Sequence, residues 1–228
     1  MDVDVRILRR RGKPARIRPG HRLTSSIFLH GVFVPPLILA STSRYRKELL
    51  ARLGIPFETR DPETDETALP GESPPSLALR LAVAKATQVA ASIETGLVIG
   101  ADQVAHCEGK LFGKPGSHAS AVLQLRWMRG RTTHFDTAVA LVDVASGRTQ
   151  GTLVGTRVTM RALTDEEIES YLCADTPYDC AGSAKCEGLG IVLMERVEGD
   201  DPTALIGLPL ISLTTMLRNE GVPLFPRR

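Results

Sequence analysis

From residue 37 onward, the chain alternates short apolar runs with longer segments whose apolar residues recur at helical spacing. The apolar runs predict strands at residues 37–40, 97–99, 135–144, 154–161 and 191–195. The other segments predict helices at residues 45–53, 76–91, 117–128, 164–173 and 209–220. Residues 58–72 are polar and contain two prolines and a glycine, which predicts a loop. Strands interleaved with helices indicate an α/β fold, in which ligands bind at the carboxyl ends of strands.

The composition is that of a globular protein, with 43% hydrophobic and 24% charged residues among 228. No apolar run approaches the roughly 20 residues needed to cross a bilayer, so we expect no membrane span. The four cysteines lack C-x-x-C spacing, which favours reduced thiols and a cytoplasmic location. A zinc site formed by Cys173, Cys180 and Cys186 is the weaker alternative.

The positive charge is concentrated at the start of the chain. Residues 1–36 hold eight Arg or Lys and two Asp, a net charge of +6, whereas residues 37–228 sum to −4. We expect residues 1–36 to be a disordered or dispensable basic arm and residues 37–228 to form one domain. A contact with nucleic acid or an anionic membrane, a targeting role and an over-long start remain alternatives for the arm.

The stretch LILASTSRYRKELL (37–50) carries the first candidate chemistry. Three hydroxyl residues at 41–43 follow the apolar run, and cations follow at 44, 46 and 47. A helix that starts here leaves backbone N–H groups unpaired and adds partial positive charge, which suits a polyphosphate. An ordinary Ser/Thr cap with surface arginines explains the same residues.

Two acidic residues lie at other predicted turns. Asp102 directly follows the apolar run that ends at Gly100, where a carboxylate can bind a divalent cation or take a proton from water. A turn-forming role is the alternative for Asp102. Glu66 can complete a Mg²⁺ site, because Mg²⁺ takes one or two protein carboxylates, although a solvated acidic loop also fits.

Two lysines are candidates for phosphate binding. Lys85 interrupts a strongly apolar predicted helix, where it either snorkels to solvent or reaches a phosphate. Lys114 stands between Gly113 and Pro115, which restrain its backbone, although a plain turn fits as well. The histidines show no metal-binding spacing, and the cysteines show no nucleophile pair.

Taken in order, these clusters make the chain resemble the Maf family of nucleoside triphosphate pyrophosphatases. The resemblance rests on LASTSRYRKELL (39–50), TDET (64–67), GADQ (100–103), GKP (113–115), CAGSAKCEGLGI (180–191) and ERVEGDDPTALIGLPL (195–210). It implies a two-lobed, inosine-triphosphatase-like α/β fold with a central mixed sheet and a cleft between the lobes. It also implies hydrolysis between the α and β phosphates with a divalent metal, Mg²⁺ or Mn²⁺.

The resemblance assigns roles by position. Asp102 matches the proton acceptor, and Glu66 matches an acid that holds the metal with Asp102. The positions around the triphosphate are Ser41, Arg46, Lys85, Lys114 and Lys185. The positions that separate the family's branches are Tyr45, Gln103 and Glu187, which look like the 7-methyl-GTP branch. The dTTP/UTP branch would show arginine, threonine and glutamine there.

The chemistry of the base agrees with that branch. Methylation at N7 gives guanine a positive charge that favours stacking on Tyr45. The carboxylate of Glu187 can accept from both N1–H and the exocyclic amino group of guanine. A helix-surface aromatic and a solvated turn acid are the plain alternatives. The chain departs from the family pattern at Arg44, Ala101, Ala184 and Cys186.

The partner expected from the resemblance is a nucleoside triphosphate, with no membrane contact and with a homodimer as the expected assembly. Alternatives are a pyrophosphatase for dTTP, UTP or another modified nucleotide, and a non-catalytic regulator of septum formation. A nucleic-acid-binding protein that uses the arm is the third alternative.

Overall fold

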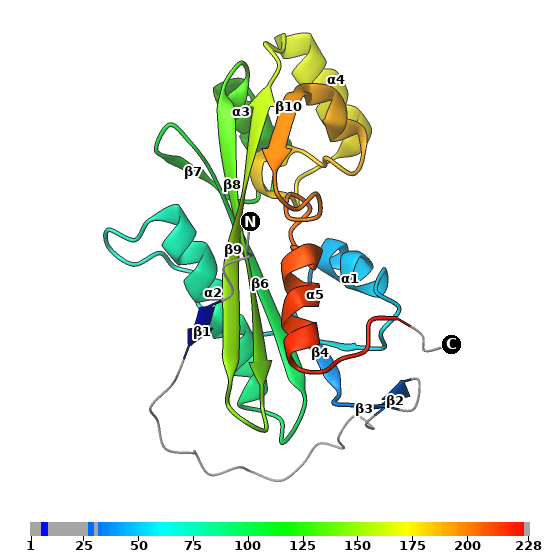
Figure 1. The fold of residues 1–228 in the computed structure, drawn as a ribbon. Coiled ribbons are helices and arrows are strands. Elements are labelled where there is room, and N and C mark those ends of the chain that lie inside the picture. The colour runs from blue at the N-terminus through cyan, green and yellow to red at the C-terminus, as the bar shows by residue number, and fades with distance from the viewer. Residues whose placement is uncertain (1–5, 9–26, 30–31, 226–228) are drawn as a thin grey trace.

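A mixed eight-stranded sheet runs through two lobes in the computed structural model, which describes residues 6–8, 27–29 and 32–225 (Figure 1). Three long strands extend through both lobes: β6 (Leu97–Cys107), β8 (Thr132–Asp143) and β9 (Thr149–Met160). They pair antiparallel in the order β6-β8-β9. The two-lobed α/β architecture with a central mixed sheet is therefore confirmed.

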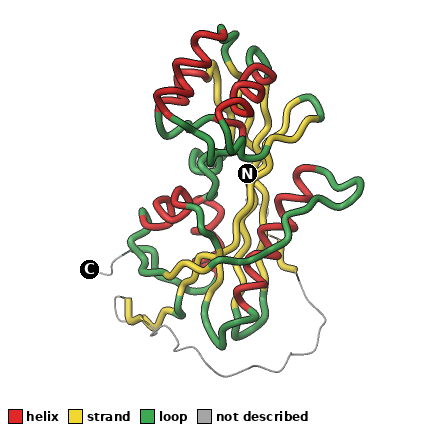
Figure 2. The backbone as a smooth tube through the Cα atoms, turned by 180° about the vertical axis from the view of Figure 1, so that it is seen from behind, coloured by secondary structure: helices red, strands yellow, loops and turns green. Residues whose placement is uncertain are grey.

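The lower lobe adds parallel strands and three helices. Strand β4 (Leu37–Ala40) pairs parallel with β6 and with β5 (Glu58–Arg60). Helices α1 (Arg44–Ala51) and α5 (Leu210–Asn219) cover one face of the sheet, and α2 (Pro74–Ala90) covers the other (Figure 2). Alternation along the strands produces this separation, because successive side chains point to opposite faces.

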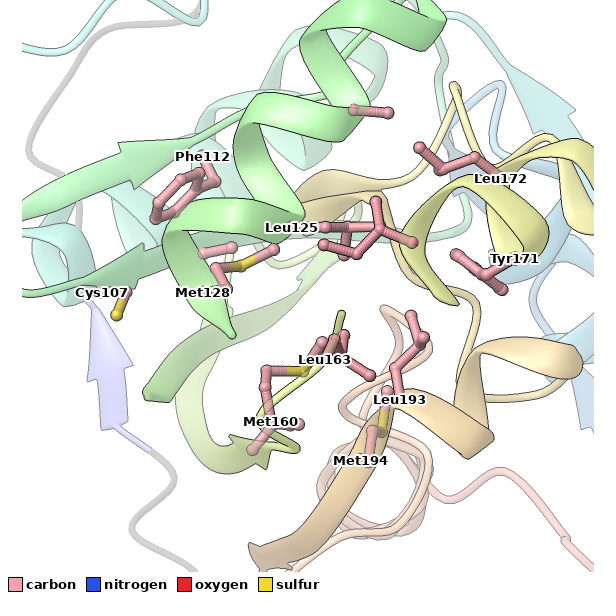
Figure 3. Close-up of a cluster of buried hydrophobic side chains, with 14 of the residues drawn as sticks. Cys107, Phe112, Leu125, Met128, Met160, Leu163, Tyr171, Leu172, Leu193 and Met194 are labelled. Carbon is pink, nitrogen blue, oxygen red and sulfur yellow. The ribbon is translucent and has the colours of Figure 1, made fainter. Parts of the chain in front are cut away.

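The upper lobe packs two helices and a hairpin on the extended strands. Strand β7 (Lys110–Phe112) pairs with β6, and β10 (Met194–Gly199) pairs with β9. Helices α3 (His118–Met128) and α4 (Asp165–Asp175) enclose a core that includes Leu125, Met160 and Leu172 (Figure 3). Full burial of each such side chain stabilises the fold by about 1.5–3 kcal/mol. Short 3₁₀ turns occupy Ala181–Ser183 and Leu189–Leu193.

The predicted basic arm lies partly outside the described residues, namely at 1–5, 9–26 and 30–31. Most of its described residues form strands: β1 (Arg6–Leu8) pairs with β9, and β2 (Ile27–Leu29) pairs with β3 (Val32–Val34). Among the described residues, no helix is long and apolar enough to cross a membrane.

The prediction that Asp102 follows the end of a strand is wrong. Strand β6 continues to Cys107, so residues 100–103 lie within it. Gly100 marks a close helix contact, because a Cβ there would lie 2.1 Å from the carbonyl oxygen of Ala82 in α2. The glycine therefore reflects the packing of α2 on the sheet and does not end the strand.

The observed boundaries of the other elements differ less from the predicted ones than those of β6 do. The loop predicted at 58–72 begins with the three residues of β5, which pair with β4. The strand predicted at 191–195 is a 3₁₀ turn up to Leu193, and β10 starts at Met194. The five predicted helices are all present, with ends that shift by about two residues, as is usual for helix termini.

Candidate active site

A cavity of about 660 Å³ opens between the lobes, beside the carboxyl end of β4. The lower lobe contributes the start of α1, the loop 61–66 and Lys85, and the upper lobe contributes residues 112–114 and most of 179–187. This volume lies within the range of about 300–1,000 Å³ that is typical of small-molecule sites. The predicted cleft between the lobes is thus present.

The start of α1 presents hydroxyl groups and backbone amides to this cavity. Ser43 is the N-cap, and its side chain accepts from the backbone N–H of Arg46 at 3.4 Å. The Ser41 hydroxyl is buried and accepts from the backbone N–H of Ser43 at 3.1 Å. The two interpretations of this stretch are therefore compatible, since the cap that starts the helix also lines the cavity.

Arg46 is held at the cavity wall by a hydrogen bond to the loop that precedes α5. Its Nε donates to the carbonyl oxygen of Gly207 at 2.9 Å. Burial lowers the pKa of Arg46, and the negative charges of Asp102 and Glu66 oppose that effect, so the guanidinium stays protonated. Its two terminal nitrogens have no hydrogen-bond partner among the described residues, which leaves them available for an anionic ligand.

Lys85 lies between the two predicted acids. Its Nζ is 2.6 Å from Asp102 Oδ1 and 2.5 Å from Glu66 Oε1. The side chains of Lys85 and Asp102 are only 7% and 9% exposed, whereas that of Glu66 is 62% exposed. Lys85 therefore belongs to the buried face of α2 and does not snorkel to solvent.

The buried position of Asp102 changes its acidity. Burial raises the pKa of Asp102, and the charges of Lys85 and Arg46 act in the opposite direction. A carboxylate whose pKa is raised is a stronger base when it is ionised. Asp102 is thus suited to accept a proton inside the cavity.

The donor atoms at this end of the cavity fit a Mg²⁺ or Mn²⁺ ion. Glu66 and Asp102 both line the cavity and supply hard carboxylate oxygens. No group of three or more His, Cys, Asp or Glu residues that could hold a metal occurs in the described part of the chain. An ion held here would therefore complete its coordination with phosphate and water oxygens, as Mg²⁺ commonly does.

A second group of cavity-lining side chains contains an aromatic ring and carboxylates. The Tyr45 hydroxyl donates to Asp179 Oδ1 at 3.2 Å, and the Arg44 guanidinium lies 4.6 Å from the Tyr45 ring centroid. Burial raises the pKa of Tyr45, which keeps the hydroxyl protonated. Glu187 is exposed and lines the cavity, where its Oε2 lies 3.5 Å from the Cys186 thiol.

Gln103 has a structural task besides its predicted role in specificity. Its Nε2 donates to the carbonyl oxygens of Ala204 and Leu205, each at 3.0 Å, and to the Thr137 hydroxyl at 2.9 Å. These bonds hold the loop whose Gly207 carbonyl accepts from Arg46. The side-chain amide donors of Gln103 are therefore already engaged, although the residue lines the cavity.

The two remaining predicted lysines differ in position. Lys114 is exposed and lines the cavity. Lys185 does not line it, because its Nζ donates to the carbonyl oxygen of Asp175 at 2.6 Å, at the end of α4. In this arrangement Lys185 fastens the 181–188 turn to α4, and its predicted contact with phosphate has no support from the geometry.

The sequence did not single out the apolar wall of the cavity or Asp179. The wall includes Phe112, Phe135, Met194 and Leu205, which come from four separate segments. No local pattern marks these residues, since each looks like an ordinary core position. Asp179 does stand directly before the CAGS turn, which is the one signal that could have drawn attention to it.

Comparison with known proteins places the chain in a family. The model of the family described as "Maf-like protein" matches residues 36–220. A 7-methyl-GTP pyrophosphatase of Ralstonia nicotianae is 61% identical over 191 residues, which cover 84% of this chain and 98% of that protein. A 7-methyl-GTP pyrophosphatase of a Polaromonas species is 58% identical over 193 residues, which cover 85% and 88%.

A solved structure gives a weaker likeness. It is a nucleoside-triphosphatase, or dITP/XTP pyrophosphatase, from Mycobacterium abscessus, with 16% identity and a TM-score of 0.40 over 82% of this chain and 95% of that chain. The family match and the two relatives are enough to assign the family without this structure, because both relatives are more than 50% identical to the chain over most of their length. The chain belongs to the Maf-like protein family.

Proposed function

We propose that this protein is a nucleoside triphosphate pyrophosphatase that hydrolyses 7-methyl-GTP to 7-methyl-GMP and pyrophosphate. The observation that carries the proposal is that two separate groups of interacting side chains line one cavity. One group, which we call the phosphate end, holds Asp102, Lys85 and Arg46 beside a helix N-terminus, and the other, which we call the base end, holds Tyr45 and Glu187. Two relatives above 55% identity bear the name of this activity.

The phosphate end supplies positive charge and a base. Lys85 and Lys114 bind and neutralise phosphate oxygens, and the terminal nitrogens of Arg46 do the same. Asp102 accepts a proton from the attacking water as the bond between the α and β phosphates breaks. Pyrophosphate leaves, and the new oxygen stays on the α phosphate.

A divalent metal is part of the proposal. Glu66 and Asp102 would hold the ion, which acts as a Lewis acid on the phosphate oxygens when it is bound. Lys85 contacts one oxygen of each carboxylate and so keeps the two acids close together.

The base end selects the nucleotide. A guanine methylated at N7 carries a positive charge, and such a ring stacks favourably on Tyr45. The Glu187 carboxylate accepts from the two Watson–Crick donors of guanine, whereas uracil and thymine offer one donor flanked by carbonyl oxygens. We also propose that the reaction takes place in the cytoplasm and that the enzyme is a homodimer.

Substitution of Asp102 tests the catalytic end. The Asp102→Asn variant keeps the shape of the side chain and removes the base, so we expect turnover to fall by about 10²–10⁴-fold. Reaction in ¹⁸O-water should place the label in 7-methyl-GMP and not in pyrophosphate, because the proposed attack is at the α phosphate. Turnover near that of the wild type would exclude Asp102 as the base.

Exchange of two residues tests the base end. Tyr45→Arg combined with Glu187→Gln replaces both base-selecting side chains with those of the dTTP/UTP branch. We expect preference to shift toward pyrimidine triphosphates, measured as kcat/KM for each nucleotide. The exposed Glu94 offers a matched control as Glu94→Gln, because it loses the same charge outside the cavity lining. An unchanged profile in the double variant would contradict the proposed selection.

A further inference from the structure

The base end of the cavity has a second carboxylate besides Glu187. Asp179 lines the cavity and is 51% exposed. Its two carboxylate oxygens accept from the Tyr45 hydroxyl at 3.2 and 3.3 Å. It also lies 3.5 Å from the Arg44 guanidinium and accepts from the Cys180 thiol at 3.5 Å. Every side-chain contact of Asp179 within the described residues is therefore with a group that lines the base end.

Arg44 occupies one face of the ring on which the base is proposed to stack. Its Cζ is 4.6 Å from the Tyr45 ring centroid, and its Nη2 donates to the Tyr45 hydroxyl at 2.5 Å. A guanidinium above an aromatic face makes the same attractive interaction that a cationic base would make. Arg44 thus also introduces a positive charge that repels a cationic base.

The negative charge of Asp179 is present at neutral pH. Partial burial acts to raise the pKa of the Asp179 carboxyl, but contacts with the Cys180 thiol, the Arg44 charge and the Tyr45 hydroxyl outweigh it, and the pKa is lowered overall. The Asp179 carboxylate therefore stands beside the Arg44 guanidinium at the base end, which Glu187 also lines.

We propose that Asp179 is a specificity-determining residue that makes this cavity prefer a positively charged purine base over its neutral counterpart, an inference that rests on the proposed function. The carboxylate pairs with Arg44 and so offsets the charge that would repel a cationic base. It also fixes the Tyr45 hydroxyl and thereby the plane of the ring. Asp179 and Glu187 together favour a base that carries a positive charge.

The test compares nucleotides that differ only in the N7 methyl group and its charge. Binding of 7-methyl-GMP and GMP is measured by calorimetry, and kcat/KM is measured for 7-methyl-GTP and GTP. In Asp179→Asn, we expect the preference for the methylated nucleotide to fall by roughly threefold to fivefold, the size typical of half-exposed charge pairs. The change should appear in the affinity and KM for the methylated nucleotide, while the values for GMP and GTP stay within about twofold of the wild type.

Two further variants separate charge selection from a structural role. Asp200→Asn removes an exposed carboxylate outside the cavity lining and should leave the preference unchanged. Arg44→Gln removes the opposing positive charge and should raise the preference for the methylated nucleotide. An equal loss for both nucleotides in Asp179→Asn, or an unchanged preference in that variant, would overturn the inference.

The binding measurement keeps this inference distinct from the proposed reaction. If the wild type binds 7-methyl-GMP more tightly than GMP but hydrolyses neither triphosphate, the proposed activity fails, and a reduced binding preference in Asp179→Asn still supports the role of Asp179. If the wild type hydrolyses 7-methyl-GTP and Asp179→Asn keeps the wild-type preference, only the role of Asp179 fails. Absence in the wild type of both a binding preference and hydrolysis of 7-methyl-GTP would overturn both proposals.

Discussion

Replacement of Lys85 by methionine should destabilise the protein strongly. The Nζ of Lys85 is 2.6 Å from Asp102 Oδ1, and both side chains are less than a tenth exposed. At an effective dielectric constant of about 20, the Coulomb attraction at this distance is about 6 kcal/mol. The cost of desolvating both charges offsets much of that attraction, and removal of one partner from a buried pair typically costs about 3–5 kcal/mol. Glu66 adds at most about 1 kcal/mol, because its side chain is mostly exposed.

Urea unfolding measures the effect of Lys85→Met. With a slope of about 2 kcal/mol per molar urea, a loss of 3–5 kcal/mol lowers the midpoint by about 1.5–2.5 M. The single tryptophan, Trp127, reports on α3 by fluorescence, and circular dichroism reports on the whole fold. Lys47→Met is the matched control, because this exposed lysine on α1 should change the free energy of unfolding by less than about 0.5 kcal/mol.

A double-variant cycle checks the assignment of this energy to the pair. Lys85→Met combined with Asp102→Asn removes both charges, so the two single costs should not add, and we expect a coupling free energy of at least about 1.5 kcal/mol. A cost below about 1 kcal/mol for Lys85→Met, or fully additive single effects, would refute the assignment of a buried, desolvated ion pair at this site.

Other features of the structure give further predictions. Gly100→Ala should lower the free energy of unfolding by more than about 3 kcal/mol or prevent folding, because its Cβ would overlap the Ala82 carbonyl; thermal unfolding measures this, and a wild-type melting temperature would contradict it. Burial raises the pKa of the Cys180 thiol to about 11 and that of the Cys186 thiol to about 12. Iodoacetamide at pH 8 should therefore modify exposed Cys173 first, and its reaction with Cys180 and Cys186 should accelerate as the pH rises toward 11. Equal labelling of the three cysteines at pH 8, measured by mass spectrometry, would contradict this. Chelation of divalent metal should abolish pyrophosphate release, and added Mg²⁺ or Mn²⁺ should restore it; activity that survives exhaustive chelation would contradict the proposed metal.

Apolar periodicity was enough to predict the helices and the α/β class, because burial imposes a regular spacing on both helices and strands. It failed at β6, where Gly100, Asp102 and Gln103 interrupt the apolar run although the strand continues. Gly100 allows α2 to pack closely, Asp102 joins the buried ion pair and Gln103 holds the 203–207 loop, and each of these partners is distant in sequence. Local patterns cannot encode such partners.

The same contrast between local patterns and distant partners holds for the candidate site. Glu66 and Asp102 were predicted to hold a metal and Lys85 to bind phosphate, and the structure brings both acids into contact with Lys85. Lys185 was expected near phosphate, but a bond to the end of α4 draws it away. Asp179 was not predicted at all, since its importance arises from two α1 residues more than 130 positions earlier in the chain.

The most direct measurement is the release of pyrophosphate by the purified protein with Mg²⁺ or Mn²⁺, compared across 7-methyl-GTP, GTP, dTTP, UTP and CTP. Asp102→Asn, assayed in parallel, controls for contaminating hydrolases. We predict a strong preference for 7-methyl-GTP in the wild type, with release lowered by orders of magnitude in the variant. Release from pyrimidine triphosphates alone would contradict the proposed selection by Tyr45 and Glu187, and no release from any of the five would contradict the proposed enzymatic function.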